Sequence, residues 1–136
     1  MKVATKYEGS MRFADGDGAA RVVMDAKPDV GGRGEALTPK QMVLQGLLGC
    51  TGMDVAAMLD RQKVRYELSL EAEADQTDAH PKVLRNIRVV YHVRAASEDR
   101  PKVERAIQLS QERFCGVSAM LKKASDVTHE LDFQPL

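Results

Sequence analysis

The stretch from Thr38 to Asp60 constrains the fold more than any other part of the sequence, because it opens like a helix and stays apolar nearly all round. Thr38 is a good N-cap, Pro39 suits the first helical position, and Gln41 completes a T-x-x-Q capping box. This pattern predicts a buried central helix that the other elements wrap, with Cys50 near its middle.

The same stretch approaches the length of a membrane span. Gln45, Asp54, Thr51 and three glycines dilute its apolar character, and the rest of the chain has the pattern of a soluble protein. The N-terminal sequence MKVATKYEGS lacks the apolar core and cleavage site of a signal peptide. We therefore expect a cytoplasmic protein with no membrane partner.

Composition excludes several other functions. The chain has 136 residues, which fits a single domain over residues 1–136. Its 20 basic residues balance 20 acidic ones, so charge does not favour binding to nucleic acid or to an anionic membrane. With no Trp, three Tyr and three Phe, it lacks an aromatic platform for single-stranded nucleic acid.

Three glycines follow one stripe of the expected central helix, at positions 46, 49 and 52. Each costs about 1 kcal/mol relative to alanine in a helix interior, so the stripe needs a reason. Small residues on one stripe let a second backbone come close. They also make room for side chains of a sheet, and the sequence does not choose between these explanations.

The other segments alternate between strand and helix patterns. Strands are expected over Lys2–Glu8, Met11–Phe13, Ala20–Asp25, Val64–Asp75, Lys82–Ala95 and Val127–Phe133, and helices over Glu98–Phe114 and Val117–Lys123. Asp15–Gly18 predicts a turn, and Ser97 is the expected N-cap of the second helix. This mixed order indicates an α+β fold.

The two long strand patterns are expected to form an antiparallel hairpin. From Val64 to Asp75 apolar and polar residues alternate, which is typical of a strand with one wet face. From Lys82 to Ala95 the apolar residues also share one face, with Arg85 as the exception.

The glycine-rich segment Pro28–Gly34 predicts a loop. It lacks the GxxxxGK[ST] and GxGxxG spacings, so no nucleotide site and no cofactor are expected.

Cys50 and Cys115 are the strongest candidates for chemistry. They lie far apart in the sequence with no CxxC motif, which excludes a thioredoxin-type site and a zinc ribbon. The histidines at positions 80, 92 and 129 are scattered, and no metal site is expected. An inert, buried cysteine on an apolar helix remains the simplest alternative.

The sequence resembles the OsmC/Ohr family of thiol-dependent peroxidases. The matching segments are Thr38–Leu44, Gly49–Cys50 and Glu112–Val117, which give a proline-led helix with a cysteine and a second cysteine after an aromatic residue. Met42 to Leu44 and the Gly-Cys pair are most similar to the YhfA-like branch. The element order is compatible over essentially the whole chain.

The resemblance implies an OsmC-like fold, with antiparallel sheets wrapped around central helices in an intertwined homodimer. Cys50 would be the peroxidatic cysteine that attacks an organic hydroperoxide and becomes a sulfenic acid. Cys115 would be the resolving cysteine that condenses with it to a disulfide, and a small dithiol or lipoyl reductant would restore both thiols.

The helix start departs from the family pattern. In the best-known members a glutamate follows the proline and holds an arginine beside the cysteine; here the position is Lys40, followed by Gln41. Arg33 is the favoured arginine, and Arg12 and Arg21 are the alternatives. Ten residues of helix span about 15 Å, so Lys40 does not reach Cys50 of its own chain.

Two functions therefore stay open. The first is a peroxidase that reduces small organic hydroperoxides in the oxidative stress response. The alternative is an OsmC-like dimer without efficient peroxidase activity that binds a small hydrophobic ligand or senses redox state. A cation is needed in the first case, because only a few per cent of an ordinary thiol is thiolate at pH 7.

Overall fold

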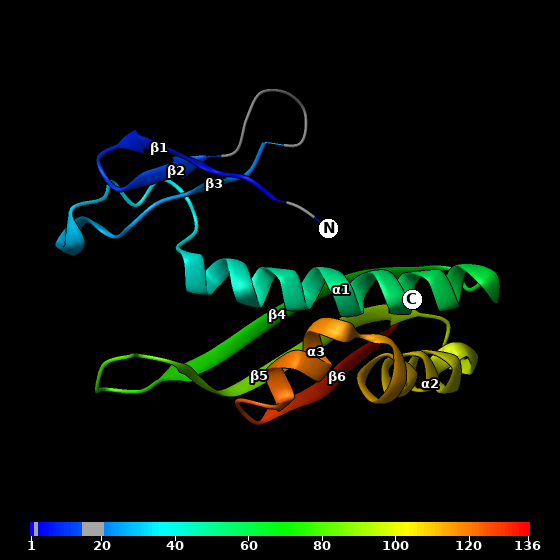
Figure 1. Ribbon diagram of the computed structural model, residues 1–136. Helices are drawn as coiled ribbons and strands as arrows, with labels where there is room; N and C mark the ends of the chain where they lie inside the picture. The colour runs from blue at the N-terminus through cyan, green and yellow to red at the C-terminus, as the bar shows by residue number, and fades with distance from the viewer. Residues whose placement is uncertain (2, 15–20) are drawn as a thin grey trace. The chain divides into compact units, whose positions relative to one another are not determined.

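The computed structural model describes residues 1, 3–14 and 21–136 of the protein. They form two compact units, Met1–Val43 and Leu44–Leu136, and each unit is described by itself. The long helix α1 (Pro39–Arg61) begins in the first unit and continues through the second (Figure 1). The single domain expected from the length stays a prediction.

The N-terminal unit is a three-stranded meander. Its strands are β1 (Lys6–Gly9), β2 (Arg12–Ala14) and β3 (Val23–Met24), paired antiparallel in the order β1-β2-β3. The first two strands lie where strands are expected, whereas β3 is shorter than the expected strand Ala20–Asp25. The turn expected at Asp15–Gly18 lies outside the described residues.

Asp25 directly follows β3 and holds the loop that comes after it. Its side chain is 2% exposed, and its carboxylate accepts hydrogen bonds from the backbone N–H groups of Ala26 (2.8 Å), Arg33 (3.3 Å) and Glu35 (3.1 Å). These N–H groups, with that of Glu35 first, lower the pKa of Asp25. The carboxylate thereby organises the loop that the sequence predicts, which contains one 3-10 turn at Pro28–Val30.

The capping box at the start of α1 is confirmed. The backbone N–H of Thr38 donates to Gln41 Oε1 at 2.9 Å, and the backbone N–H of Gln41 donates to Thr38 Oγ1 at 3.3 Å. Two N–H groups at the helix start, which have no partner within the helix, are satisfied in this way.

The second unit contains a mixed sheet. Its strands are β4 (Tyr66–Gln76), β5 (Leu84–Ala95) and β6 (Val127–Pro135), in the order β4-β5-β6. The β4–β5 hairpin is antiparallel, as predicted. The β5–β6 pair is parallel, which corrects the expectation of purely antiparallel sheets. The two helices between β5 and β6 supply the long crossover that a parallel pair requires.

A β-bulge changes the expected face of Arg85. The pairing of β4 with β5 shifts between Glu73 and Asp75, where Asn86 has a φ of 50°. The extra residue reverses the alternation, so Leu84 turns half-buried toward the core and Arg85 is exposed. Asn tolerates the left-handed conformation, and Asn86 Nδ2 donates to Asp75 Oδ2 at 2.9 Å.

The helical segment after β5 is divided into three parts. It consists of α2 (Arg100–Leu109), a π-helical turn (Ser110–Phe114) and α3 (Gly116–Lys122). Ser97 is not the N-cap, which corrects the prediction: Ser97–Asp99 forms a 3-10 turn and the α-helix starts after Asp99, with Pro101 in its first turn. The break expected at Cys115 is confirmed, because this residue is extended.

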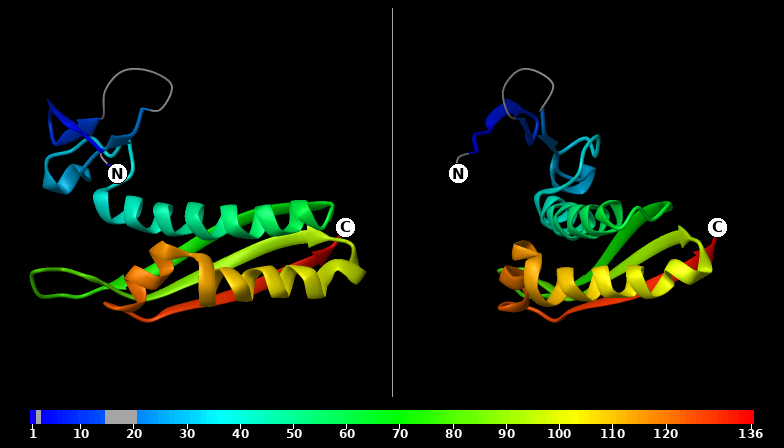
Figure 2. Two further views of the ribbon diagram at one scale, coloured as in Figure 1. Left: turned by 45° about the vertical axis from the view of Figure 1, so that its right-hand side comes forward. Right: turned by 90° about the vertical axis from the view of Figure 1, so that its right-hand side faces the viewer.

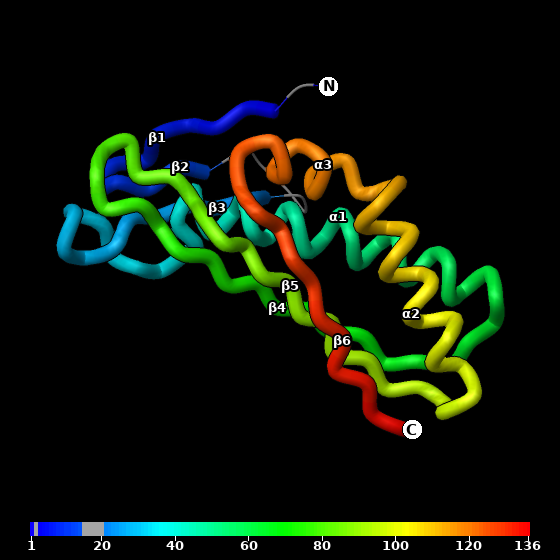
Figure 3. Tube along the Cα trace, turned by 90° about the horizontal axis from the view of Figure 1, so that it is seen from below, coloured from blue at the N-terminus to red at the C-terminus, as the bar shows by residue number. Residues whose placement is uncertain are grey.

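The core of the second unit lies between the sheet and the helices. Figures 2 and 3 show α1 and α2 along one face of the β4–β5–β6 sheet. The largest buried apolar side chains are Tyr91, Leu47, Leu59, Ile87, Val55, Val89, Val93 and Val103. The charged residues of β4 and β5, among them Glu71 and Arg88, occupy the exposed face.

The helix α1 has the length and composition of a membrane span, although only 22% of its most apolar window is buried within the chain. Its buried residues, Leu47, Thr51, Val55 and Leu59, belong to the interior of the second unit. The helix therefore packs one face into the core, whereas the prediction of a helix buried all round is not met within the described chain, where Val43 and Met53 are exposed.

Candidate thiol site

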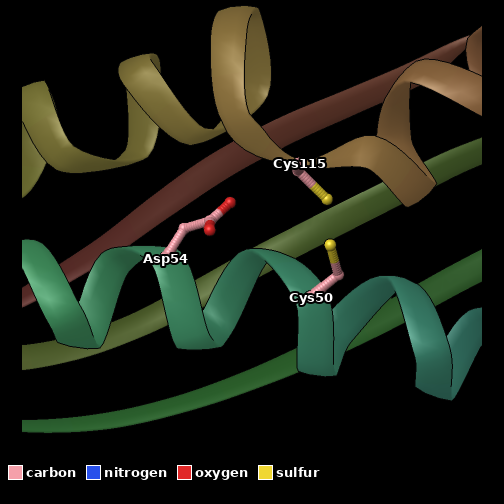
Figure 4. A group of neighbouring side chains, drawn as sticks. All are labelled: Cys50, Asp54 and Cys115. Carbon is pink, nitrogen blue, oxygen red and sulfur yellow. The ribbon is translucent and has the colours of Figure 1, made fainter.

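The structure brings the two cysteines together. Cys50 lies on α1 and Cys115 in the break between the π-helical turn and α3, and both are free thiols. Their Sγ atoms and a carboxylate oxygen of Asp54 all lie within 4.8 Å of one another. Figure 4 shows the two sulfur atoms facing each other, with Asp54 one turn further along α1.

Cys115 is the buried member of the pair. Its side chain is 3% exposed, and its Sγ accepts a hydrogen bond from the backbone N–H of Ser118 at 3.4 Å. Burial raises the pKa of the Cys115 thiol to about 11, and the nearby Cys50 thiol and Asp54 carboxylate act in the same direction. Cys115 is therefore a neutral thiol near pH 7.

Cys50 is half-buried and is the more accessible thiol. The π-helical turn fixes how Cys115 meets it, because the backbone N–H of Cys115 donates to the Ser110 carbonyl at 2.8 Å and the chain then becomes extended. Such single π turns often occur at functional sites.

A network of buried hydroxyl and amide groups lies beside the thiols. Thr51 Oγ1 is 2.5 Å from Tyr91 OH and 2.7 Å from Ser110 Oγ. Gln111 Nε2 donates to Tyr91 OH at 2.7 Å, and Ser118 Oγ donates to Gln111 Oε1 at 2.9 Å. The network joins α1, β5, the π-helical turn and α3, so it fixes the elements that carry the two cysteines.

Asp54 connects this network to the thiols. Ser110 Oγ donates to Asp54 Oδ2 at 2.8 Å. Within the described part of the chain, no buried side-chain nitrogen or oxygen lacks a hydrogen-bond partner. The polar groups are therefore compatible with burial, since unpaired ones would be costly.

Sequence reasoning missed Asp54 and the network. Asp54 is one of the few polar residues of the central helix and lies four positions after Cys50, so helical periodicity places the two on one face. That spacing was the available signal. Nothing in the sequence pairs Tyr91 with Thr51, Ser110 or Gln111, because these contacts arise only when the elements pack.

The other predicted site residues belong to the N-terminal unit. Arg33 is exposed, and its guanidinium has no ion-pair partner among residues 1, 3–14 and 21–136. Lys40 is half-buried in the first turn of α1, and Gln41 forms the capping box. The roles predicted for these three residues stay predictions.

The alternative arginines are engaged in ion pairs. Arg12 Nε lies 3.1 Å from Glu8, and its Nη1 lies 3.4 Å from Glu35. Arg21 Nη2 lies 2.7 Å from Glu8.

The histidines lie apart from the cluster of thiols and carboxylate. His80 is exposed, and His92 is 2.9 Å from Asp132 at the surface of the sheet. Asp132 raises the pKa of His92. The ring of His129 packs edge-on against Tyr91 at 6.4 Å between centroids.

Comparison with known proteins shows which family the chain is similar to. Residues 32–130 match the family model described as OsmC-like protein. Protein YhfA of Escherichia coli K12 is 28% identical over 136 residues, and the match covers 97% of each chain.

Solved structures share the fold at low identity. An OsmC-like protein from Mycoplasma pneumoniae has a TM-score of 0.79 at 12% identity, covering 96% of this chain and 94% of that one. The organic hydroperoxide resistance protein OsmC from Legionella pneumophila has a TM-score of 0.67 at 18% identity, covering 97% of both. With the family-model match spanning most of the sequence, the chain belongs to the OsmC-like protein family.

Proposed function

We propose that the protein is a thiol-dependent peroxidase that reduces organic hydroperoxides with Cys50 and Cys115. The observation that carries this proposal is the pairing of a half-buried thiol with a buried one, their sulfur atoms within 4.8 Å. The name of the Legionella relative, an organic hydroperoxide resistance protein, supports the substrate class.

The first step uses Cys50 because it is the accessible thiol. Its thiolate attacks the terminal oxygen of the hydroperoxide, and the O–O bond breaks. The leaving alkoxide takes up a proton and departs as the alcohol, and Cys50 becomes a sulfenic acid. The substrate is reduced by two electrons, and the sulfur is oxidised by two.

The second step uses Cys115. Its sulfur attacks the sulfenic sulfur of Cys50, so an S–S bond forms and the S–O bond breaks. The thiol proton and the released hydroxide leave as water. The disulfide requires an S–S length of about 2 Å, so the two sulfur atoms, which lie within 4.8 Å of each other, must move closer to react. A dithiol or lipoyl reductant then restores both thiols by exchange.

A cation must favour the Cys50 thiolate. We propose Arg33 for this role, because its guanidinium has no ion-pair partner in the described ranges, whereas Arg12 and Arg21 are held by glutamates. Lys40 and Gln41 occupy the segment that positions this arginine in the family, so we propose that they contribute to its placement.

We also propose a homodimer that buries the free face of α1. Met53 is 74% exposed there, and added Cβ atoms at Gly46 and Gly49 would meet nothing of the described chain. Gly52 differs, because a Cβ there would lie 3.3 Å from Leu70 of β4. Gly52 thus makes room for a side chain of the sheet, whereas Gly46 and Gly49 leave space for a second backbone.

An open groove of about 430 Å³ follows the same face. Its lining includes Gln45, Leu48, Gly49, Met53, Leu68 and Leu70. A second copy seated on this face would cover the groove. Lys40 at the family's glutamate position favours the second candidate function, a dimer that binds a small hydrophobic ligand or senses redox state without efficient turnover. A cytoplasmic location is proposed for either function.

The two functions are separated by a peroxidase assay on the reduced full-length protein with cumene hydroperoxide and dithiothreitol. Wild type should consume hydroperoxide well above the rate without protein, and Cys50→Ser should fall to that background. Once dithiothreitol has been removed, one equivalent of hydroperoxide should leave Cys115→Ser with a Cys50 sulfenic acid that dimedone traps. Equal rates for wild type and Cys50→Ser would reject the peroxidase and leave the second candidate.

A further inference from the structure

The two thiols and the Asp54 carboxylate form a set of metal ligands. Cys50 and Asp54 project from successive turns of α1, and Cys115 faces them from the break before α3 (Figure 4). One ligand atom from each residue lies within 4.8 Å of the other two. We propose that the reduced protein binds one soft divalent cation, of the Zn²⁺ class, at Cys50, Asp54 and Cys115.

The separations suit a tetrahedral centre after a small contraction. With Zn–S near 2.3 Å and Zn–O near 2.1 Å, ligand atoms of a tetrahedral site lie roughly 3.5–3.8 Å apart. The observed limit of 4.8 Å exceeds this by about 1 Å, which side-chain rotation covers. The backbone of α1 need not move, because ligands four positions apart on a helix share one face, the spacing used by helical zinc motifs.

The ligand types select among cations. Two sulfur ligands favour Zn²⁺ and similar soft ions, whereas Mg²⁺ and Ca²⁺ prefer sites made of oxygen. Three protein ligands leave the fourth tetrahedral position for water or another small ligand. Cys50 is half-buried, so its sulfur is the ligand that an incoming ion would meet first.

The carboxylate is already oriented by the protein. Ser110 Oγ donates to Asp54 Oδ2 at 2.8 Å, and Ser110 is itself held by Thr51 at 2.7 Å. Hydrogen bonds of this kind fix ligating carboxylates in metal sites.

Metal binding and thiol oxidation exclude each other, because both use the same sulfur atoms. If the proposed peroxidase function holds, one hydroperoxide and two protons convert the two metal-bound thiolates to a disulfide. The products are the alcohol, one water and the free cation. The proposal thus adds a metal-protected resting state to the thiol pair, and binding itself does not depend on peroxidase activity.

The test measures Zn²⁺ affinity of the reduced full-length protein by competition with a chromophoric chelator. Wild type should bind about one equivalent, and Asp54→Asn should bind at least tenfold more weakly. Asp60→Asn is the matched control, because it removes the same charge from an exposed position of the same helix and should bind like wild type. The amide oxygen that Asp54→Asn introduces can still accept the hydrogen bond from Ser110, so the fold is preserved.

Cobalt provides a second readout on the wild-type protein. Co²⁺ should give the thiolate-to-cobalt absorption of a sulfur-ligated site in the reduced form, and the disulfide form should not give it. The site is overturned if Zn²⁺ affinity is unchanged in any of three proteins: the oxidised wild type, the double variant with both cysteines replaced by serine, or Asp54→Asn. Peroxidase activity is measured separately, in excess chelator, so that the two proposals can fail independently. Activity without zinc binding rejects only the metal site. Zinc binding without activity rejects only the peroxidase.

Discussion

At the scale of single residues, the two cysteines differ in exposure, and this difference indicates which of them reacts first. Cys50 is half-buried, whereas Cys115 is 3% exposed with its pKa raised to about 11 by burial. At pH 8 only about one Cys115 in a thousand is then thiolate. The nucleophile that an electrophile meets first is Cys50, which agrees with its proposed peroxidatic role.

We expect iodoacetamide to label Cys50 before Cys115 in the reduced protein at pH 8, as followed by mass spectrometry of tryptic peptides. Because only the thiolate reacts, the labelling rate of Cys115 in the Cys50→Ser variant should rise about tenfold per pH unit through pH 8 to 10. A Cys115 rate that levels off by about pH 9 to 10 would show that its pKa is not raised.

Only some of the residues in the candidate site could be predicted from the sequence. It singled out Cys50 and Cys115, because cysteines are few and the resemblance supplied their roles. It did not single out Asp54, whose relation to Cys115 depends on how α1 packs against the segment before α3. The buried carboxylate of Asp25 was also missed, since its partners are backbone N–H groups, which every sequence contains.

At the scale of elements, Tyr91 holds three segments together. Its hydroxyl on β5 contacts Thr51 of α1 at 2.5 Å and Gln111 of the π-helical turn at 2.7 Å. The side chain is fully buried, so no water replaces a partner that is removed. The elements that carry Cys50 and Cys115 are therefore tied through one hydroxyl group.

Tyr91→Phe should lower the free energy of unfolding by about 1–3 kcal/mol, because Gln111 loses a partner for its buried amide. Tyr66→Phe is the matched control: the Tyr66 hydroxyl donates to Asp60 Oδ1 at 2.9 Å in an exposed pair, and its loss should cost less than about 1 kcal/mol. Urea unfolding followed by circular dichroism measures both, and equal costs would contradict the central role of Tyr91.

Elements with a local signal were predicted, and those defined by packing were not. The capping box placed the start of α1 because all of its partners lie within four residues. The alternation of β4 likewise gave its exposed and buried faces. In contrast, the bulge at Asn86 and the parallel partner of β5 depend on which strand lies alongside, which alternation does not encode.

At the scale of the whole molecule, the free face of α1 is the feature that a monomer leaves unexplained. Only 22% of its most apolar window is buried within the chain, and Met53 is 74% exposed. Apolar surface concentrated on one helix is typical of an interface. The resemblance predicts a homodimer that would cover this face, whereas the glycine stripe alone leaves the choice open.

Wild type should therefore have twice the 15.0 kDa mass of the chain in light scattering at micromolar concentration. Met53→Lys should shift the mass toward that of one chain, because it places a charge in the proposed interface. Met120→Lys is the control, since Met120 is a similarly exposed methionine, at 64%, on the different helix α3. A monomeric wild type, or equal masses for both variants, would contradict the proposed dimer.

The parallel pairing of β5 and β6 also bears on the protein during its synthesis. A parallel pair requires a crossover, and the crossover of this chain carries Cys115. Cys50 precedes the crossover in the sequence, so it emerges from the ribosome before Cys115, the thiol that it faces in the fold. In the proposed mechanism, a Cys50 sulfenic acid formed in this interval has no Cys115 thiol to condense with, which leaves it open to further oxidation to the irreversible sulfinic form.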